Sequence, residues 1–458
     1  MAVFLLIVLL IIEIGFSVYG LTGAFKKNEW ALRRLIAKAV QAVIFFLMVL
    51  LPGIDLSFRF YGLILILLIR IVFSVGKAVI LRKNEGTEKK WMMILGTCFG
   101  VLLLTVSMIP AFFFADYHGR KTTGDYEVGE RQAILIDPSR VEAFEDDGSH
   151  REVPVHFYFP VYEEEADAEA AAHSLPLVIF SHGAFGYYQS NTSTYMELAS
   201  HGYVVVSLDH PYHSFFTKDS EGKTITVDPE FISTAMKLGG DDNPYSEEET
   251  FEISSKWMEL RIADTGFVID RLKEAATTGE LTDDWFFTND PEESIVKVME
   301  LADPERIGVM GHSLGGATAV SMGRRSDVKA VIDLDGTMIG EQTGVKDGQP
   351  VIKEEPYTTP LLAINSEKHE FEIIEAQKVS YSYANNVVLE HAEEGHETYI
   401  PGSDHMNFTD LPLFAPALAK MLGTGSVDAG ECIDQTNALV LSFFDCYLKG
   451  EGNFTIAE

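Results

Sequence analysis

The chain has 458 residues, which is more than one ordinary domain, so at least two regions are expected. Its formal net charge of −33 is uneven, because residues 1–116 contain 12 Lys and Arg against 6 Asp and Glu, and the rest contains 23 against 62. A domain with this much negative charge would repel the phosphate groups of a nucleic acid, so the composition excludes a nucleic-acid-binding protein.

Four apolar stretches open the chain, at 2–19, 35–51, 61–81 and 91–114. Each approaches or exceeds the length of about 20 residues that crosses a bilayer. The first has no basic flank and no small-residue cleavage site, which argues against a cleaved signal peptide. We therefore predict an all-α transmembrane region with four spans over 1–116. Buried helices of a soluble domain are the alternative, but the stretches show almost no amphipathic pattern.

Basic residues concentrate in two of the three connections between these stretches. They are Lys26, Lys27, Arg33 and Arg34 in the first and Arg82, Lys83, Lys89 and Lys90 in the third, whereas the second offers Arg59 alone. Basic loops stay in the cytoplasm, so both termini are expected outside. This predicts a multi-pass protein of the cell membrane with its soluble domain on the extracytoplasmic side. Among the intramembrane charges, an ion pair between Glu13 and Arg70 is expected rather than a transport role.

The soluble domain is expected over 117–458, with strands that alternate with helices. Strand patterns lie at 153–159, 175–180, 203–208, 328–334 and 360–365, and a last strand is expected to begin at 387–389. Helical patterns lie at 195–200, 259–274 and 436–448. This alternation predicts an α/β fold with a doubly wound, mostly parallel sheet. The acidic segment 215–256 interrupts it as a candidate lid; calcium binding at 241–249 is the alternative, without EF-hand spacing.

The first motif follows the strand at 175–180, in the sequence SHGAFG at 181–186. A His-Gly turn at this place supplies the second oxyanion donor in serine hydrolases of the α/β class, and the candidate is the backbone N–H of Ala184. His182 is expected to hold the turn by hydrogen bonding. After the next strand, His210 and His213 are expected to form a structural turn rather than a metal site, because Pro211 separates them and no third ligand lies nearby.

The most informative stretch is RIGVMGHSLGGATAVSMG at 306–323. An apolar strand, the pattern G-x-S-x-G and a small-residue helix follow one another, as the nucleophile elbow requires. The turn would expose the hydroxyl of Ser313, and the N–H of Leu314 would face the oxyanion of an acyl-transfer intermediate. The alternative is an ordinary glycine-rich turn without a catalytic role.

A serine needs a histidine base and an acid that orients it, and in α/β-hydrolases the order is Ser, acid, His. The acids at strand ends downstream are Asp333, Asp335 and Glu367, and the histidines are His369, His391, His396 and His405. Asp335 is preferred because it lies nearest the carboxyl end of its strand, and Glu367 is the alternative. His405 is preferred because it lies in a loop after the last strand, and His396 is the runner-up.

Five motifs in order resemble the platelet-activating-factor acetylhydrolase family of α/β-hydrolases. They are FSHGAFG at 180–186, GHSLGG at 311–316, DLDG at 333–336, PLLAINSE at 360–367 and SDHMNF at 403–408. The resemblance implies a catalytic domain with Ser313, Asp335 and His405 as nucleophile, acid and base. It implies Leu314 and Ala184 as oxyanion donors, and it disfavours Glu367. The four spans and the acidic insert depart from the family pattern.

The function predicted is a membrane-embedded serine esterase or lipase that acts on a lipid or small ester. The resemblance implies short or oxidised acyl chains of phospholipids, with no cofactor and no metal. A general carboxylesterase or a polyester- or dienelactone-type hydrolase is the alternative among enzymes. Alternatives from other classes are a membrane sensor with a non-catalytic hydrolase-like domain and a transporter with an appended enzyme. The sequence gives no oligomeric state.

The chain contains three cysteines. Cys98 lies in an apolar stretch, Cys432 directly precedes a possible helix at 433–448, and Cys446 lies near the end of that helix. On one helix the latter two would lie about 20 Å apart, at ~1.5 Å per residue, which is beyond disulfide reach. No zinc-ligand spacing is visible, so no disulfide is predicted.

Overall fold

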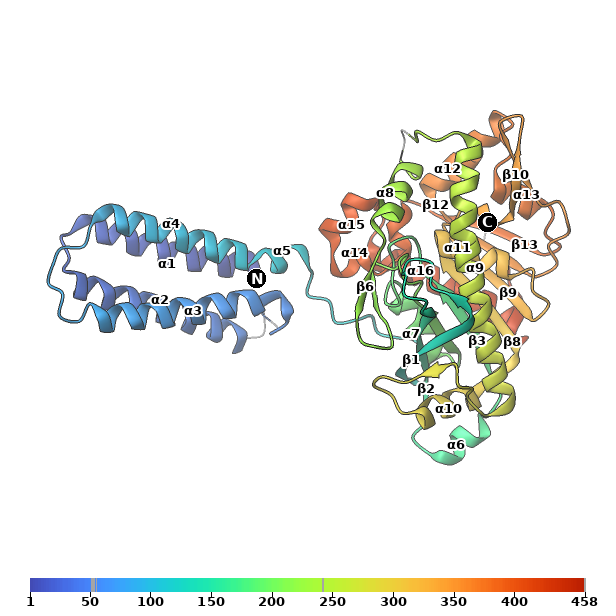
Figure 1. Cartoon of the computed structure of the whole chain (residues 1–458), viewed down its shortest axis with the longest axis horizontal. Coiled ribbons are helices and arrows are strands. Elements are labelled where there is room, and N and C mark those ends of the chain that lie inside the picture. Colours follow the sequence, from blue (N-terminus) through green and yellow to red (C-terminus); the bar gives the residue numbers. More distant parts are fainter. Residues whose placement is uncertain (51–53, 55, 241–242, 457–458) are drawn as a thin grey trace. The chain divides into compact units, whose positions relative to one another are not determined.

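The computed structural model describes the whole chain except residues 51–53, 55, 241–242 and 457–458 (Figure 1). The chain divides into two compact units. The first comprises residues 1–118 with 413–418, and the second comprises 119–412 with 419–458.

The first unit is helical. Its helices are α1 (Ala2–Thr22), α2 (Lys27–Leu50), α3 (Phe58–Ile80), α4 (Lys90–Ser107) and the short α5 (Ile109–Phe113). Three of them, α1, α3 and α4, are long and apolar enough to cross a membrane. Helix α2 is as long as these three helices but carries the charged residues Arg33, Arg34 and Lys38. Its role as one of four spans stays a prediction.

A polar cluster lies inside this unit. The Glu13 carboxylate, in α1, accepts hydrogen bonds from Arg70 in α3 and, at 3.3 Å, from Gln41 in α2. Arg34 lies 3.4 Å from the other carboxylate oxygen. The ion pair expected between Glu13 and Arg70 is therefore present, and a paired charge costs far less in an apolar interior than an isolated one.

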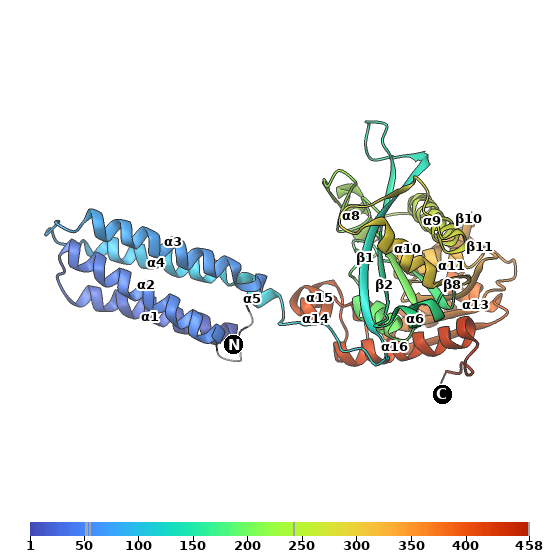
Figure 2. The same ribbon diagram turned by 90° about the horizontal axis from the view of Figure 1, so that it is seen from below.

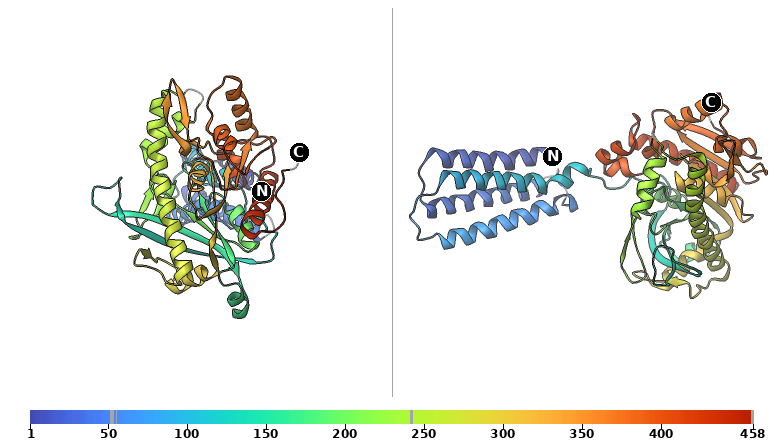
Figure 3. Two further views of the ribbon diagram at one scale, coloured as in Figure 1. Left: turned by 90° about the vertical axis from the view of Figure 1, so that its right-hand side faces the viewer. Right: turned by 45° about the horizontal axis from the view of Figure 1, so that its top comes forward.

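The second unit is built on a nine-stranded sheet with the strand order β13-β12-β9-β8-β3-β4-β2-β1-β7. Its strands are β1 (Glu127–Val141), β2 (His150–Val161), β3 (Leu175–Ser181), β4 (Val204–Leu208), β7 (Trp285–Phe286), β8 (Ala302–His312), β9 (Val328–Leu334), β12 (Leu361–Ser366) and β13 (Gly395–Ile400). Strands β4, β3, β8, β9, β12 and β13 are parallel. The long β1–β2 ribbon, teal in Figure 3, and β7 pair antiparallel at the other edge. The predicted α/β fold with a mostly parallel sheet is confirmed.

Helices cover both faces of this sheet, as a doubly wound fold requires. One face packs against α9 (Glu247–Thr278), α10 (Glu292–Leu301), α11 (Leu314–Met322) and α13 (Ala384–Glu390). The other packs against α7 (Thr192–Ser200) and α16 (Ala429–Phe444). Figure 2 shows α16 and the pair α9 and α11 on opposite sides of the strands.

The chain contains further elements. They are α6 (Glu165–Ala170), β5 (Phe216–Lys218), β6 (Thr224–Thr226), α8 (Pro229–Leu238), η1 (Ile339–Glu341), β10 (Gln342–Lys346), β11 (Gln349–Ile352), α12 (Glu367–Lys378), η2 (His405–Phe408), α14 (Leu411–Phe414), α15 (Pro416–Leu422) and the π-helical turn η3 (Asp445–Lys449). The segment proposed as a lid, 215–256, thus holds the β5–β6 hairpin, α8 and the first turns of α9.

The prediction of a strand at 387–389 is wrong. These residues belong to α13, where Ala384 and Val388, one helical turn apart, are buried. The last strand is β13, an edge strand whose side chains alternate in exposure, so it lacks the continuous apolar run that marks a buried strand. All three cysteines are free thiols: Cys98 is exposed on α4, Cys432 is buried and Cys446 is half-buried.

Candidate active site

Ser313 occupies a strained turn between the end of β8 and the start of α11. Its φ of 55° is in the left-handed region, which non-glycine residues rarely adopt. The turn is held by a 2.9 Å hydrogen bond from the Ser313 N–H to the Leu334 carbonyl of the neighbouring strand β9. Such strain persists only where the surroundings impose it, as they do at a nucleophile elbow.

Two glycines give this turn its room. A Cβ atom on Gly311 would lie 2.2 Å from the carbonyl oxygen of Gly315, and one on Gly315 would lie 1.9 Å from the carbonyl oxygen of Ser181. These gaps are too short for any side chain. The G-x-S-x-G pattern therefore reflects the close approach of α11 to β3 and β8.

The structure brings Ser313, His405 and Asp335 together from three separate elements. His405 is the first residue of η2, and its Nε2 lies 3.0 Å from the Ser313 hydroxyl oxygen. The other ring nitrogen, Nδ1, lies 2.7 Å from Oδ2 of Asp335. Asp335 directly follows β9 and has a φ of 53°. The side chain of His405 is 40 % exposed, so it remains accessible to a substrate.

The other acids occupy different places. Asp333 is buried and accepts a 2.9 Å hydrogen bond from the Gly336 N–H. Burial, together with the charge of Asp335, raises the pKa of Asp333 well above its ordinary value. The two side chains therefore have different partners, because strand alternation ends at Leu334. Glu367 begins α12, where its N–H donates to the Ser403 hydroxyl.

The other histidines also have partners away from the serine. His396 lies on β13, with Nε2 3.0 Å from the Tyr447 hydroxyl oxygen. Nδ1 of His391 lies 2.7 Å from the Val387 carbonyl oxygen.

The charge balance of the pair Asp335–His405 favours an ionised acid beside a basic imidazole. Burial would raise the pKa of Asp335, but hydrogen bonds from His369 and His405 hold it well below its ordinary value. Partial loss of solvation likewise works against protonated His405, but the hydrogen bond to Asp335 and its negative charge prevail, so the pKa of His405 is raised. An ionised carboxylate thus stabilises the imidazolium that forms when His405 takes a proton.

The candidate oxyanion turn, 182–186, lies against the elbow. A Cβ atom on Gly183 would lie 3.2 Å from Cβ of Ser313. The Ala184 N–H donates to no acceptor within the part of the chain that the structure describes. Leu314 is the first residue of α11, a position whose N–H has no partner inside a helix. His182 holds the turn as expected, with Nε2 2.7 Å from the Ser214 hydroxyl oxygen.

Sequence reasoning missed Arg261, which anchors this turn. Arg261 is fully buried in α9, and its guanidinium donates hydrogen bonds to the carbonyl oxygens of His182 and Gly183. Burial lowers the pKa of Arg261 to about 9. With both carbonyls directed toward Arg261, the next N–H in the turn, that of Ala184, is left for the site. No local signal marks this role, because the partners lie 78 and 79 residues away in sequence.

Two further histidines support the pair Asp335–His405. Nδ1 of His369 lies 3.2 Å from Oδ1 of Asp335, and its Nε2 lies 2.8 Å from the Tyr383 hydroxyl oxygen. His312 lies beside the serine in sequence. Burial lowers the pKa of His312 to about 3, so its ring is neutral, and Nε2 lies 3.0 Å from the His405 carbonyl oxygen. The sequence placed His369 among candidate bases, whereas the structure puts it behind the acid.

The two histidines considered as metal ligands, His210 and His213, contact other side chains in the structure. Nδ1 of His210 lies 3.0 Å from the Asp264 carboxylate, and its Nε2 lies 2.9 Å from the Ser181 hydroxyl oxygen. The ring of His213 stacks on Phe231. The two leading aspartates of the acidic run 241–249, Asp241 and Asp242, lie outside the described residues.

Comparisons with known proteins show the family to which the chain belongs. A family model described as platelet-activating factor acetylhydrolase, isoform II, matches residues 155–456. The platelet-activating factor acetylhydrolase of Gallus gallus is 27% identical over 305 residues, 61% of this chain and 63% of that protein. The one from Bos taurus is 25% identical over 297 residues, 61% of this chain and 58% of that protein.

A probable 1-alkyl-2-acetylglycerophosphocholine esterase of Arthroderma benhamiae is 22% identical over 302 residues, 63% of this chain and 64% of that protein. The matches thus span about three fifths of the length of these relatives. Among solved structures, a ferulic acid esterase from Streptomyces cinnamoneus has a TM-score of 0.50 at 21% identity and covers 74% of this chain and 95% of that one, which concerns the fold alone. Because the family model covers about two thirds of the chain, the chain belongs to the platelet-activating factor acetylhydrolase, isoform II, family.

Proposed function

We propose that this protein is a membrane-anchored serine hydrolase that cleaves carboxylic esters, with Ser313 as nucleophile, His405 as base and Asp335 as the acid that orients it. The observation that carries the proposal is the unbroken hydrogen-bonded series from the Ser313 hydroxyl through His405 to Asp335, at 3.0 and 2.7 Å. A binding module has no use for an activated hydroxyl on a strained turn.

The reaction runs in two steps. Nε2 of His405 takes the proton of Ser313 as the hydroxyl oxygen attacks the ester carbonyl carbon, and the N–H groups of Leu314 and Ala184 bind the oxyanion. The same proton then goes to the departing alcohol as the carbon–oxygen bond breaks, leaving an acyl-serine. A water molecule, deprotonated by His405, then attacks this ester; as the bond to the serine oxygen breaks, His405 returns the proton to that oxygen and the carboxylic acid leaves.

For the substrate, we propose phospholipids with a short or oxidised acyl chain. The relatives named above support this choice, since their names refer to platelet-activating factor and to 1-alkyl-2-acetylglycerophosphocholine. Three helices that are long and apolar enough to span a bilayer support anchoring. The distribution of basic residues between the loops supports a catalytic domain on the extracytoplasmic side.

The test is the Ser313→Ala variant of the full chain. It should lose ester turnover and labelling by a fluorophosphonate probe, retaining at most the residual rate of about 10³–10⁴ over water that binding and oxyanion terms supply. The substrates are p-nitrophenyl esters of graded chain length, followed by 2-acetyl and long-chain phospholipids. Ser321→Ala, on the same helix as the elbow, is the matched control. Wild-type turnover in Ser313→Ala would refute the mechanism, and a preference for long-chain or non-lipid esters would refute the substrate.

A further inference from the structure

A small apolar cluster begins at the proposed oxyanion hole and continues into the acidic insert. Its buried members are Val227, Phe231, Met258, Leu314 and Ala317, and the partly buried side chains packed on it include Ala184, Phe185 and Trp257. Two of these residues, Leu314 and Ala184, are the proposed oxyanion donors. An acyl chain whose carbonyl oxygen sits between those two N–H groups therefore starts beside this cluster.

Phe231, in α8, closes the far side of the cluster. Its ring is 4 % exposed and stacks on His213, with centroids 3.8 Å apart and planes 3° apart. Trp257 and Phe185 meet it edge-on, at centroid distances of 5.0 and 5.5 Å. Three aromatic contacts hold the ring in one place.

Phe231 also borders a cavity of about 760 Å³. Phe231, Trp257 and Leu260 lie along its apolar part, and charged side chains that include Arg140, Glu142 and Lys256 line the rest. Its volume falls within the range of ligand pockets, about 300–1,000 Å³. Phe231 and Trp257 thus belong both to the cluster beside the elbow and to the lining of the cavity.

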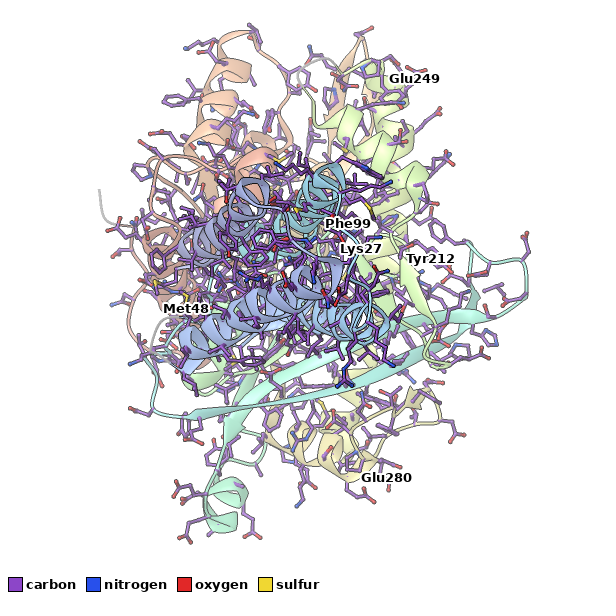
Figure 4. The ribbon with its side chains drawn as sticks, turned by 90° about the vertical axis from the view of Figure 1, so that its left-hand side faces the viewer. Lys27, Met48, Phe99, Tyr212, Glu249 and Glu280 are labelled. Atoms are coloured by element: carbon purple, nitrogen blue, oxygen red, sulfur yellow. The ribbon has the colours of Figure 1, made fainter. Side chains whose placement is uncertain are left out.

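The frame around this cavity is well fixed. Glu249, which Figure 4 labels, forms a capping box with Ser246 at the start of α9. Tyr212, also labelled there, stacks on the lining residue Phe144 with centroids 4.4 Å apart. Removing the Phe231 side chain would therefore join the cavity to the cluster without dismantling its walls.

We propose that this cavity is a latent extension of the acyl-binding site and that Phe231, as its closed end wall, limits the enzyme to short acyl chains. The inference rests on the proposed function and deepens it, since it assigns the selection of chain length to one side chain of the insert. With Phe231 in place, the chain meets an aromatic wall after a few carbons. Without it, the chain extends into the cavity along Trp257 and Leu260.

The experiment compares full-length wild-type protein and Phe231→Ala, in detergent micelles, on p-nitrophenyl esters from acetate to decanoate. Wild type should prefer the shortest chains. In Phe231→Ala the ratio of kcat/KM for octanoate to that for acetate should rise at least about tenfold, because each methylene newly buried is worth about fourfold. The double variant Phe231→Ala with Ala263→Phe, which refills the cavity from α9, should cancel the gain.

Met236→Ala is the matched control, since Met236 lies on the same helix but is 63% exposed. Should Phe231→Ala fail to fold by its melting curve, Phe231→Leu carries the same test with a smaller opening. An unchanged chain-length profile in either folded variant would overturn the inference while leaving the esterase intact. Absence of turnover on every ester by wild type would instead defeat the proposed function.

Discussion

The carboxylate of Asp335 contacts two imidazole rings. Oδ2 faces His405 and Oδ1 faces His369, and the Ser366 N–H also donates to Oδ1. A carboxylate with this many donors keeps its charge in a buried site and has little freedom to rotate. His405 is thereby held in one tautomer, with Nε2 free to accept the serine proton.

If His405 is the base as proposed, this pairing should set the pH dependence of ester hydrolysis. His405 acts as a base only when neutral, and Asp335 raises its pKa, so kcat/KM should fall as the pH drops through a value above that of an ordinary histidine. In Asp335→Asn the negative charge that raises the pKa of His405 is lost, while the loss of solvation that lowers this pKa remains. The acid limb should then move to lower pH, and kcat should fall by about 10⁴. The measurement is the pH profile of kcat/KM for both proteins; an unmoved limb in Asp335→Asn would assign the titration to another group.

A second residue-scale prediction concerns Arg261. Arg261→Lys keeps a cation but loses the two-pronged donation to the carbonyl oxygens of His182 and Gly183. The Ala184 N–H should then be poorly aimed, and loss of one oxyanion donor costs about 10²–10³ in kcat. We expect kcat to fall by about 10² with KM little changed.

The matched control is Arg271→Lys, on the same helix, where the side chain pairs with Asp284 near the surface. A purely structural role for Arg261 would appear as a lowered melting temperature with kcat preserved in the folded fraction, and that result would contradict the prediction.

At the scale of elements, the close contact between α11 and β3 depends on Gly315. Its missing Cβ leaves room for the Ser181 carbonyl oxygen, which a methyl group would approach to 1.9 Å. Gly315→Ala should therefore destabilise the second unit by about 3 kcal/mol, at the upper end of overpacking effects. The measurement is thermal unfolding. Gly344→Ala is the control, because a Cβ there meets nothing within 4 Å; equal melting temperatures for both variants would contradict the prediction.

The elbow also shows how much of this molecule its sequence predicts. The strand, turn and helix around Ser313 are contiguous, and so are the strand ends that carry Asp335 and the turn that carries Ala184, so local patterns were sufficient to find them. The same patterns predicted the mostly parallel sheet. They placed the last strand in α13 instead of β13, because a short apolar run in a helix and one in a strand look alike.

What the sequence did not predict are partnerships between distant segments. Arg261 lies in the middle of a long helix and donates to backbone carbonyls, which leave no trace in residue type. His369 was visible as a histidine, but its place behind Asp335 depends on how α12 leaves β12. The wall at Phe231 likewise depends on the packing of α8, whose sequence resembles that of any amphipathic helix.

At the scale of the whole molecule, the uneven charge of the chain predicts sidedness. If the basic first and third loops remain in the cytoplasm, the acidic domain lies outside. Protease added to intact cells should then digest the domain while a cytoplasmic marker protein survives, and the fluorophosphonate signal should disappear from the full-length band.

Disrupted cells provide the control for protease susceptibility. Protection of the domain until the membrane is broken would place it in the cytoplasm and refute the topology. The chemistry proposed for Ser313 would be unaffected, because it depends on the second unit alone.

The three free cysteines differ in exposure, so they differ in how readily a thiol reagent reaches them. Cys432 is buried, and burial raises the pKa of its thiol to about 12, so it hardly supplies the thiolate that alkylating agents need. Cys98 is exposed on α4, a helix apolar enough to span a bilayer. If lipid surrounds that helix, a water-borne maleimide reaches Cys98 only after detergent strips the lipid away. Labelling that is mapped to Cys98, and not to the half-buried Cys446, thus distinguishes immersion of α4 in lipid from exposure to water.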